Sequence, residues 1–317
     1  MVRDFAEVKG QEKANRALEI AATGRHHLLM LGSPGSGKSM LAARLSGILP
    51  PLSPTEALET SMIHSLAGLL SDGGIKRVRL FREPHHTASV AVIVGRGRNA
   101  KPGEISLAHS GVLFMDEFPE YPRTALETLR QPVEFGEGVV ARANAHVQYP
   151  CRFMLVAATN PCKCGYLADP CLCPRSYLWQ KYMSRISGPL MDRFDLRIEV
   201  PPVALYDLDL PQSGETSAMI TARVAAGRAV QTARFAGTSM RVNADLEGRA
   251  LEDVAIPDAD GKDLLLRVAE RFGLSARGYH RVLRMARTIA DWDGSEDVCK
   301  PHVAEAAGYR LALSKEL

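Results

Sequence analysis

The sequence has no apolar run long enough to cross a membrane as a helix, and its first residues lead directly into polar sequence. It lacks a strong charge imbalance, since 39 basic residues accompany 36 acidic ones for a formal net charge of +3. Internal repeats and low-complexity tracts are also lacking. With no membrane segment and no secretory signal, we expect a cytoplasmic protein without a membrane partner. Bulk charge alone does not indicate a nucleic-acid ligand.

A glycine-rich segment stands between an apolar run and a helical pattern. Residues 28–31 are all apolar, residues 32–39 read Gly-Ser-Pro-Gly-Ser-Gly-Lys-Ser, and residues 40–45 have the pattern of a helix. This is the G-x-x-x-x-G-K-S sequence of a phosphate-binding loop, in the strand–loop–helix context that such a loop needs. The glycines let backbone N–H groups surround phosphate oxygens, and the following helix directs its positive end at the same anion.

The phosphate-binding loop predicts ATP and Mg²⁺ as cofactors. Lys38 is expected to reach the β- and γ-phosphates, and the hydroxyl of Ser39 is expected to ligate Mg²⁺. The predicted nucleotide-binding residues of this segment are Gly32, Ser33, Pro34, Gly35, Ser36, Gly37, Lys38, Ser39 and Met40.

A second apolar run, residues 112–115, ends in two acids, Asp116 and Glu117. This pattern predicts a buried parallel strand with carboxylates at its carboxyl end, the edge where open α/β sheets bind ligands. Asp116 is expected to hold Mg²⁺, largely through water. Glu117 is expected to polarise the attacking water as the general base.

Two further polar residues are candidates for the same site. A third apolar run, residues 153–159, precedes Asn160, which is suited to orient the water or to sense the γ-phosphate. Arg193 stands shortly before a predicted strand at residues 196–200, and an arginine can stabilise the charge on a transferring phosphoryl group from a neighbouring subunit. The alternatives are a turn-capping Asn160 and an ordinary ion pair of Arg193 with a nearby aspartate.

Four of the six cysteines crowd one segment in the pattern C-x-C, six residues, C-x-C. They are Cys162, Cys164, Cys171 and Cys173. Four thiolates can close a tetrahedral zinc site, although the single-residue spacing is tighter than the usual C-x₂-C. We favour a structural zinc ion over free thiols.

Five further stretches of the sequence are specific enough to compare with known families. They are residues 5–11, 84–89, 101–109, 160–165 and 274–277. With the nucleotide motifs they extend over nearly the whole chain, and they resemble the magnesium-chelatase-like branch of the AAA+ ATPases, the ComM/YifB family. The resemblance implies that Val8 and Gly10 contact the adenine. It also implies that Arg193 acts in trans and that Arg277 touches the γ-phosphate. One departure is that arginines replace part of a glycine run at residues 95–98. Full-length relatives also carry an N-terminal domain resembling the Lon S5-like fold before the adenine segment, so we expect this sequence to be a motor fragment or a shortened form.

The family resemblance implies an α/β fold: a P-loop NTPase αβα sandwich with a parallel sheet over residues 1–202, and a mostly helical lid over residues 203–317. Two insertions are expected, a helix-2 insert at about 71–108 and a hairpin at about 132–148. Helical patterns occupy residues 218–235, 262–271, 279–292 and 301–313.

The function implied by the resemblance is a homo-oligomeric ATP-driven motor, a hexameric ring acting on single-stranded or branched DNA. Such a motor would serve as a branch-migration helicase in recombination or natural transformation. Arg96, Arg98 and Arg142 are candidates for phosphate contacts on a threaded strand, unless the hairpin only packs between subunits. Two alternatives are a magnesium-chelatase motor subunit driving metal insertion into a porphyrin and a protein-remodelling ATPase.

Overall fold

The structure is a computed structural model that describes residues 4–70, 74–96, 101–141, 146–161, 181–203 and 215–312. The chain divides into two compact units. The helical unit comprises Met1–Leu29, Gly47–Leu49 and Phe194–Leu317, and the P-loop unit comprises Met30–Ser46 and Pro50–Arg193. The division into domains at residue 202 stays a prediction.

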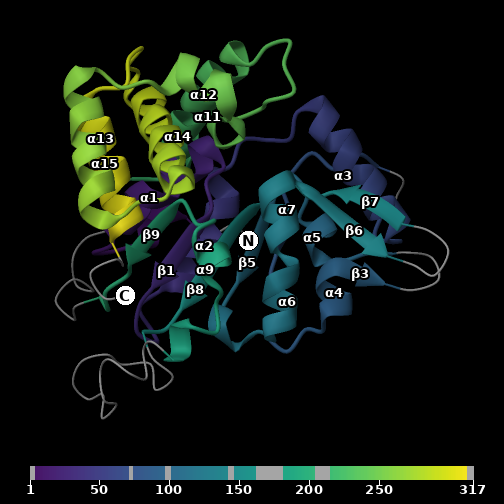
Figure 1. The fold of residues 1–317 in the computed structure, drawn as a ribbon. Coiled ribbons are helices and arrows are strands. Elements are labelled where there is room, and N and C mark those ends of the chain that lie inside the picture. The colour runs from purple at the N-terminus through teal and green to yellow at the C-terminus, as the bar shows by residue number, and fades with distance from the viewer. Residues whose placement is uncertain are drawn as a thin grey trace. The chain divides into compact units, whose positions relative to one another are not determined.

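The central sheet has five strands in the order β2-β5-β8-β1-β9. Strands β5, β8, β1 and β9 are labelled in Figure 1. Their bounds are Leu28–Leu31 for β1, Phe81–Arg82 for β2, Val112–Met115 for β5, Met154–Thr159 for β8 and Leu196–Glu199 for β9. Pairing is parallel between β2 and β5 and between β5 and β8. The runs in β1, β5 and β8 are buried along their whole length, as strands of a sheet covered on both faces must be. The predicted α/β P-loop fold is confirmed.

The P-loop unit surrounds its strands with short helices and two antiparallel hairpins. Its helices are α2 (Lys38–Ile48), α3 (Pro54–Leu66), α4 (Val90–Val94), α5 (Glu104–Leu107), η2 (Phe118–Glu120), α6 (Arg123–Thr128), α7 (Arg130–Phe135) and α9 (Gly188–Met191). The hairpins are β3 (Gly95–Arg96) with β4 (Lys101–Pro102) and β6 (Glu137–Ala141) with β7 (His146–Pro150).

The insert at 71–108 does more than interrupt the sheet, because it contributes a strand to it. Strand β2 pairs with β5, with Phe81 opposite Val112. The second insertion also differs from its prediction. Its first residues, 132–135, are helical, and Gly136 ends that helix with φ 68°, a conformation that glycine adopts without strain. The hairpin therefore begins after Gly136 rather than at residue 132.

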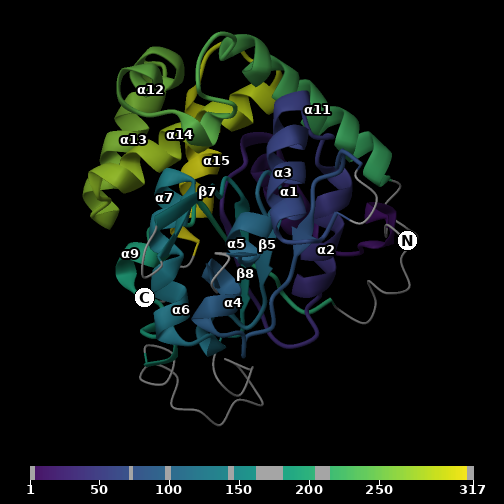
Figure 2. The ribbon, with the colours of Figure 1, turned by 90° about the vertical axis from the view of Figure 1, so that its right-hand side faces the viewer.

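The helical unit contains β9 and the start of β1 from the sheet. Its helices are η1 (Phe5–Glu7), α1 (Glu12–Gly24), α11 (Ser217–Arg234), η3 (Asn243–Asp245), α12 (Gly248–Ala255), α13 (Ala259–Phe272), α14 (Ala276–Asp293) and α15 (Lys300–Leu311). All four predicted helical patterns correspond to helices. Helix α11 lies against α1 (Figure 2). The approach is close at Gly227, where a Cβ would come within 2.6 Å of the Thr23 side chain. Arg228 secures the contact by donating to the Ala22 carbonyl at 2.7 Å.

Four basic residues, Lys76, Arg77, Arg79 and Arg82, fall close together in the sequence, which is typical of a solvated surface. In the structure this run is solvated only in part. Arg79 donates to both carboxylate oxygens of Glu56, at 3.0 and 2.8 Å, and to backbone carbonyls. Arg82 pairs with Glu104 at 2.7 Å. Arg79 therefore holds the insert to α3, and Arg82 joins two parts of the insert to each other, so both arginines are weak candidates for contacts with nucleic acid.

We expect Arg79→Ala to lower the free energy of unfolding by about 3 kcal/mol, because Glu56 would keep a largely buried charge without its partner. Arg77 in the same run is exposed, so Arg77→Ala is the matched control and should leave stability nearly unchanged. Chemical denaturation of both variants measures the difference. Equal midpoints would contradict the structural role of Arg79.

Candidate active site

The loop between β1 and α2 has the backbone of an anion cradle. Gly35 and Gly37 adopt φ values of 78° and 91°, which side chains disfavour. No atom lies within 4 Å of the position that a Cβ of Gly35 would take, so backbone conformation rather than crowding requires glycine there. The loop leads into α2, whose first residue is Lys38. The backbone N–H groups of the loop and the positive end of α2 thus belong to one short segment.

Lys38 is buried and held in place by neutral oxygen acceptors. Its Nζ donates to the carbonyl oxygens of Gly32 and Ser33 at 2.7 and 2.9 Å, and to Oδ1 of Asn160 at 3.2 Å. Burial lowers the pKa of the Lys38 ammonium, and the charge of Asp116 opposes this shift. A buried ammonium that is held by neutral oxygens is suited to bind a phosphate oxygen.

The parallel register brings the ends of β5 and β8 to the same edge of the sheet. Met115 lies opposite Ala157, so the residues that follow each strand emerge together. The backbone N–H of Gly32 donates to the Thr159 carbonyl at 3.2 Å, which ties the start of the loop to β8. The sheet therefore explains why Asp116, Asn160 and the glycine-rich loop share one site.

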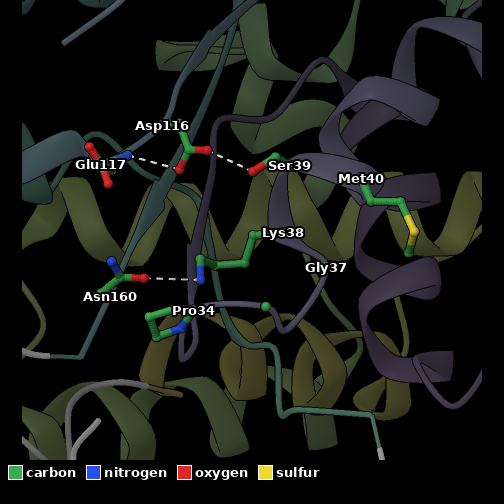
Figure 3. A pocket seen from close by; sticks show the side chains of 9 residues that line it. Pro34, Gly37, Lys38, Ser39, Met40, Asp116, Glu117 and Asn160 are labelled. Carbon is green, nitrogen blue, oxygen red and sulfur yellow. Dashed lines mark hydrogen bonds between the residues drawn. The ribbon is translucent and has the colours of Figure 1, made fainter. Parts of the chain in front are cut away.

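Ser39 and Asp116 are in direct contact. The Ser39 hydroxyl donates to Oδ2 of Asp116 at 2.6 Å, and Oδ1 of Asp116 accepts from the backbone N–H of Glu117 at 2.9 Å (Figure 3). A hydroxyl and a carboxylate are the hard oxygen donors that Mg²⁺ prefers. Burial and the charge of Asp116 raise the pKa of Glu83, a third carboxyl group nearby, which the sequence did not indicate. The residues present fit a bound Mg²⁺ ion.

Glu117 has an unusual backbone. Its φ and ψ are 51° and 44°, the left-handed region that few residues other than glycine adopt. Its carboxylate Oε2 lies 3.0 Å from Nδ1 of His86, and the two side chains are 47% and 32% exposed. The sequence placed His86 in a family string without a role. Its proximity to Glu117 follows from the pairing of β2 with β5, which no local signal reveals.

A pocket of about 320 Å³ joins these groups. Its lining residues are Pro34, Gly35, Gly37, Lys38, Ser39, Met40, Asp116, Glu117 and Asn160 (Figure 3). The structure thus brings these predicted residues together, all of them in the P-loop unit. Their individual chemical roles stay predictions. Ser36, another residue of the loop, is buried and does not line the pocket.

Arg193 lies elsewhere in the P-loop unit and is buried. Its guanidinium pairs with Glu134 and donates to the carbonyl oxygens of Arg130, at 3.2 Å, and of Pro189. Arg193 therefore forms an ion pair, and its partner is Glu134 on α7. The role of Arg193 in trans stays a prediction.

The remaining predicted contacts belong to the helical unit. Val8 is buried, and Gly10 has a φ of 66°. Arg277 is exposed in the first turn of α14, where the Ser275 hydroxyl accepts from the N–H of Gly278 at 3.1 Å. The adenine and γ-phosphate roles given to these residues stay predictions.

Several predictions fall on residues outside the described ranges. These residues are Cys162, Cys164, Cys171, Cys173, Arg98 and Arg142, together with the side chain of Arg96. The zinc site therefore stays a prediction. Within the described part of the chain, no group of three or more His, Cys, Asp or Glu side chains is placed to hold a metal ion. Among the described helices, none is long and apolar enough to span a bilayer.

Family comparison agrees with this geometry. The family model described as magnesium chelatase, subunit ChlI, matches residues 4–208, and the model of the ChlI C-terminal region matches residues 214–310. The chain belongs to the magnesium chelatase ChlI family. Together the two models extend over both the P-loop motifs and the C-terminal helices, so the predicted AAA+ resemblance is confirmed.

Individual relatives fall into two groups. Competence protein ComM of Haemophilus influenzae is 46% identical over 98% of this chain and 60% of that protein. The uncharacterized protein YifB of Escherichia coli is 44% identical over 97% of the chain and 60% of its own length. The magnesium-chelatase 38 kDa subunit of Cereibacter sphaeroides is 24% identical over 99% of the chain and 91% of that subunit. The chain thus spans about 60% of the length of ComM and YifB.

Proposed function

We propose that this chain binds ATP in the pocket and hydrolyses it, as the motor core of an oligomeric ring that acts on DNA. The observation that supports hydrolysis best is the contact of Ser39 with Asp116 at 2.6 Å, beside the anchored Lys38. Two elements far apart in sequence supply the two parts of one phosphate–metal site. The family assignment also supports ATP hydrolysis.

The polar side chains that line the pocket each have a part in the proposed reaction. Lys38 binds phosphate oxygens, and Ser39 with Asp116 would hold Mg²⁺, which supplies charge stabilisation at the phosphates. Glu117 accepts a proton from the attacking water, and Asn160 orients that water. Arg193 from a neighbouring subunit would complete the site after leaving Glu134, which explains why a ring is part of the proposal.

DNA is the proposed partner because the chain is nearly twice as similar to ComM, which is named a competence protein, as to the magnesium-chelatase subunit. Single-stranded or branched DNA would contact the basic residues of the hairpins. The second candidate is a chelatase motor subunit, favoured by the 91% coverage of the Cereibacter subunit. Stimulation of the ATPase rate by DNA would distinguish the DNA motor from the chelatase subunit.

We expect the ATPase rate to rise several-fold with single-stranded or four-way-junction DNA, and Lys38→Ala to abolish the rate with or without DNA. Because phosphate contacts release counterions, raising salt from about 50 to 200 mM should weaken DNA binding by roughly 10³-fold for six or more contacts. Steady-state ATPase assays and DNA titrations over this salt range measure both effects. An assembled ring that binds no DNA at low salt would contradict the DNA role and leave the chelatase alternative.

A further inference from the structure

Helix α3 buries most of its polar side chains and exposes its apolar ones. Leu58, Met62 and Leu66 recur every four residues, so they form one stripe along the helix, and all three are more than half exposed. Leu69, just beyond the helix, is also exposed. A surface helix of a globular protein normally does the reverse and turns its apolar stripe toward the core. The stripe on α3 faces away from the core of the P-loop unit.

Polar contacts hold the buried face of α3 in place. Glu56 pairs with Arg79 at 2.8 Å, and both side chains are largely buried. Nε2 of His64 lies 3.1 Å from the carbonyl oxygen of Leu107. Rotation of the helix would break these contacts and leave buried polar groups without partners, which is costly. The P-loop unit therefore cannot cover the apolar stripe by turning α3 inward.

A second segment adds apolar surface beside α3. The backbone N–H of Lys76 donates to the hydroxyl of Ser61 at 2.9 Å, which holds residues 75–78 next to the helix. Ile75 and Val78 of this segment are 62% and 70% exposed. Fourteen large apolar side chains are exposed in the described part of the chain, and six of them belong to this short region. These six side chains form the α3 patch: Leu58, Met62, Leu66, Leu69, Ile75 and Val78.

The size of the α3 patch matches one side of a protein interface. Six side chains at about half exposure or more present on the order of 500 Å² of apolar surface, the size at which a patch on a single subunit marks an interaction site. One side of a standard interface has about 800 Å², of which somewhat more than half is apolar. The α3 patch therefore supplies the apolar part of one such side.

The charges that accompany the α3 patch are positive. Lys76 and Arg77 lie between its last two members in the sequence, and Arg77 is exposed. The carboxylates of α3 are engaged within the same unit, because Glu56 pairs with an arginine and Glu59 with a histidine. A surface that complements this patch is apolar and carries negative charge.

The helical unit has a surface of this kind at the end of α12 and the start of α13. Residues 252–263 contain five acidic residues and one lysine, all of them exposed, and Ile256 among them is 61% exposed. Residues 249–267 stay negative, with five acids against three bases, when the arginines that pair with two of these acids are counted. We call this surface the acidic face; its acids are Glu252, Asp253, Asp258, Asp260 and Asp263.

We propose that the α3 patch of one subunit packs against the acidic face of the next copy of this chain, an inference that rests on the oligomeric assembly in the proposed function. The two surfaces differ, so the contact is head-to-tail, and its repetition closes into a ring when the rotation allows. Burial of the apolar stripe stabilises the contact, and the opposite charges around it set the orientation of the two copies.

The first test is Met62→Asp, which places a charge at the centre of the stripe. Because Met62 is exposed in the single subunit, the variant should fold, but burying its unpaired charge in the contact should weaken association by about 10²-fold or more. Met219→Asp is the matched control, because Met219 is about half exposed on α11 and belongs to neither surface. Sedimentation over a range of protein concentrations, with Mg²⁺ and a non-hydrolysable ATP analogue, measures association. Thermal denaturation checks that each variant is folded.

A charge reversal tests the partner surface. Glu252→Lys together with Asp253→Lys should weaken association, because positive charge would then lie on both sides of the contact. The same two substitutions combined with Met62→Asp should recover about tenfold of the lost association, because each head-to-tail contact would again join opposite charges.

The outcomes separate this inference from the proposed function. If wild type stays monomeric with the nucleotide analogue at every concentration, the proposed ring and this inference both fail, whereas ATP binding and hydrolysis are measured independently. If wild type assembles and folded Met62→Asp assembles equally well, only the inference is overturned, and the α3 patch serves a different partner. The inference is overturned as well if the lysine substitutions leave wild-type association unchanged or give the Met62→Asp variant no recovery.

Discussion

Replacing Glu117 by Gln is expected to lower kcat for ATP hydrolysis by about 10²- to 10⁴-fold, the range that a general base contributes. The amide has the shape of the carboxylate, and its oxygen can still accept from His86, but it cannot take the proton of the attacking water. The change leaves the contact of Ser39 with Asp116 and the bonds of Lys38 in place, so ATP affinity should change by less than about twofold.

Measurement requires kcat and affinity from the same preparation. Steady-state phosphate release gives kcat, and titration with a non-hydrolysable ATP analogue gives the affinity. Glu120→Gln is the matched control, because Glu120 pairs with Arg185 at 2.9 Å and does not line the pocket. It should keep kcat within about twofold. A Glu117→Gln enzyme that turns over like this control would remove Glu117 from the chemistry.

The strands that could be predicted are those that are apolar throughout. The runs that became β1, β5 and β8 are buried on both faces, and burial on both faces is what makes a run apolar enough to recognise. Strand β2 has two residues, Phe81 and Arg82, both only partly buried. A strand this short leaves no periodicity, so its place at the edge of the sheet could not be predicted.

The residues of the site also divide into those that the sequence could predict and those that it could not. Lys38, Ser39 and Asp116 belong to motifs whose spacing reflects local chemistry, and they lie together as that chemistry requires. The neighbours His86 and Glu83 reach the site only because β2 pairs with β5. Such long-range pairing has no signature in the local sequence.

The ion-pair partners of Arg79 and Arg193 could not be predicted from the sequence either. Arg79 looked like part of a basic surface, but it lies against Glu56, 23 positions earlier in the chain. Arg193 has nearby aspartates in sequence, and the structure pairs it with Glu134 on α7. In both cases packing of distant segments selects the partner, whereas charge patterning along the chain shows only that a charge is available.

Replacing Lys38 by Ala is expected to weaken ATP binding by about 10²-fold or more. A charge-assisted hydrogen bond contributes about 1.5–3 kcal/mol, and each 1.4 kcal/mol is a factor of ten in affinity, so loss of two phosphate contacts predicts roughly 10²- to 10⁴-fold. The effect should be large here because Lys38 is buried and bonded to neutral oxygens, so its charge is available to the phosphates.

The control for Lys38→Ala is Lys262→Ala, which removes an exposed ammonium from α13 in the helical unit. Calorimetric titration with ATP and Mg²⁺ measures both variants, and thermal denaturation shows whether the loop carbonyls tolerate loss of their donor. A folded Lys38→Ala protein that binds ATP as tightly as the Lys262→Ala control would contradict the phosphate role of Lys38. The pocket would then hold something other than a nucleoside triphosphate, because its remaining side chains, Asp116 and Glu117 above all, repel an anion unless a cation accompanies it.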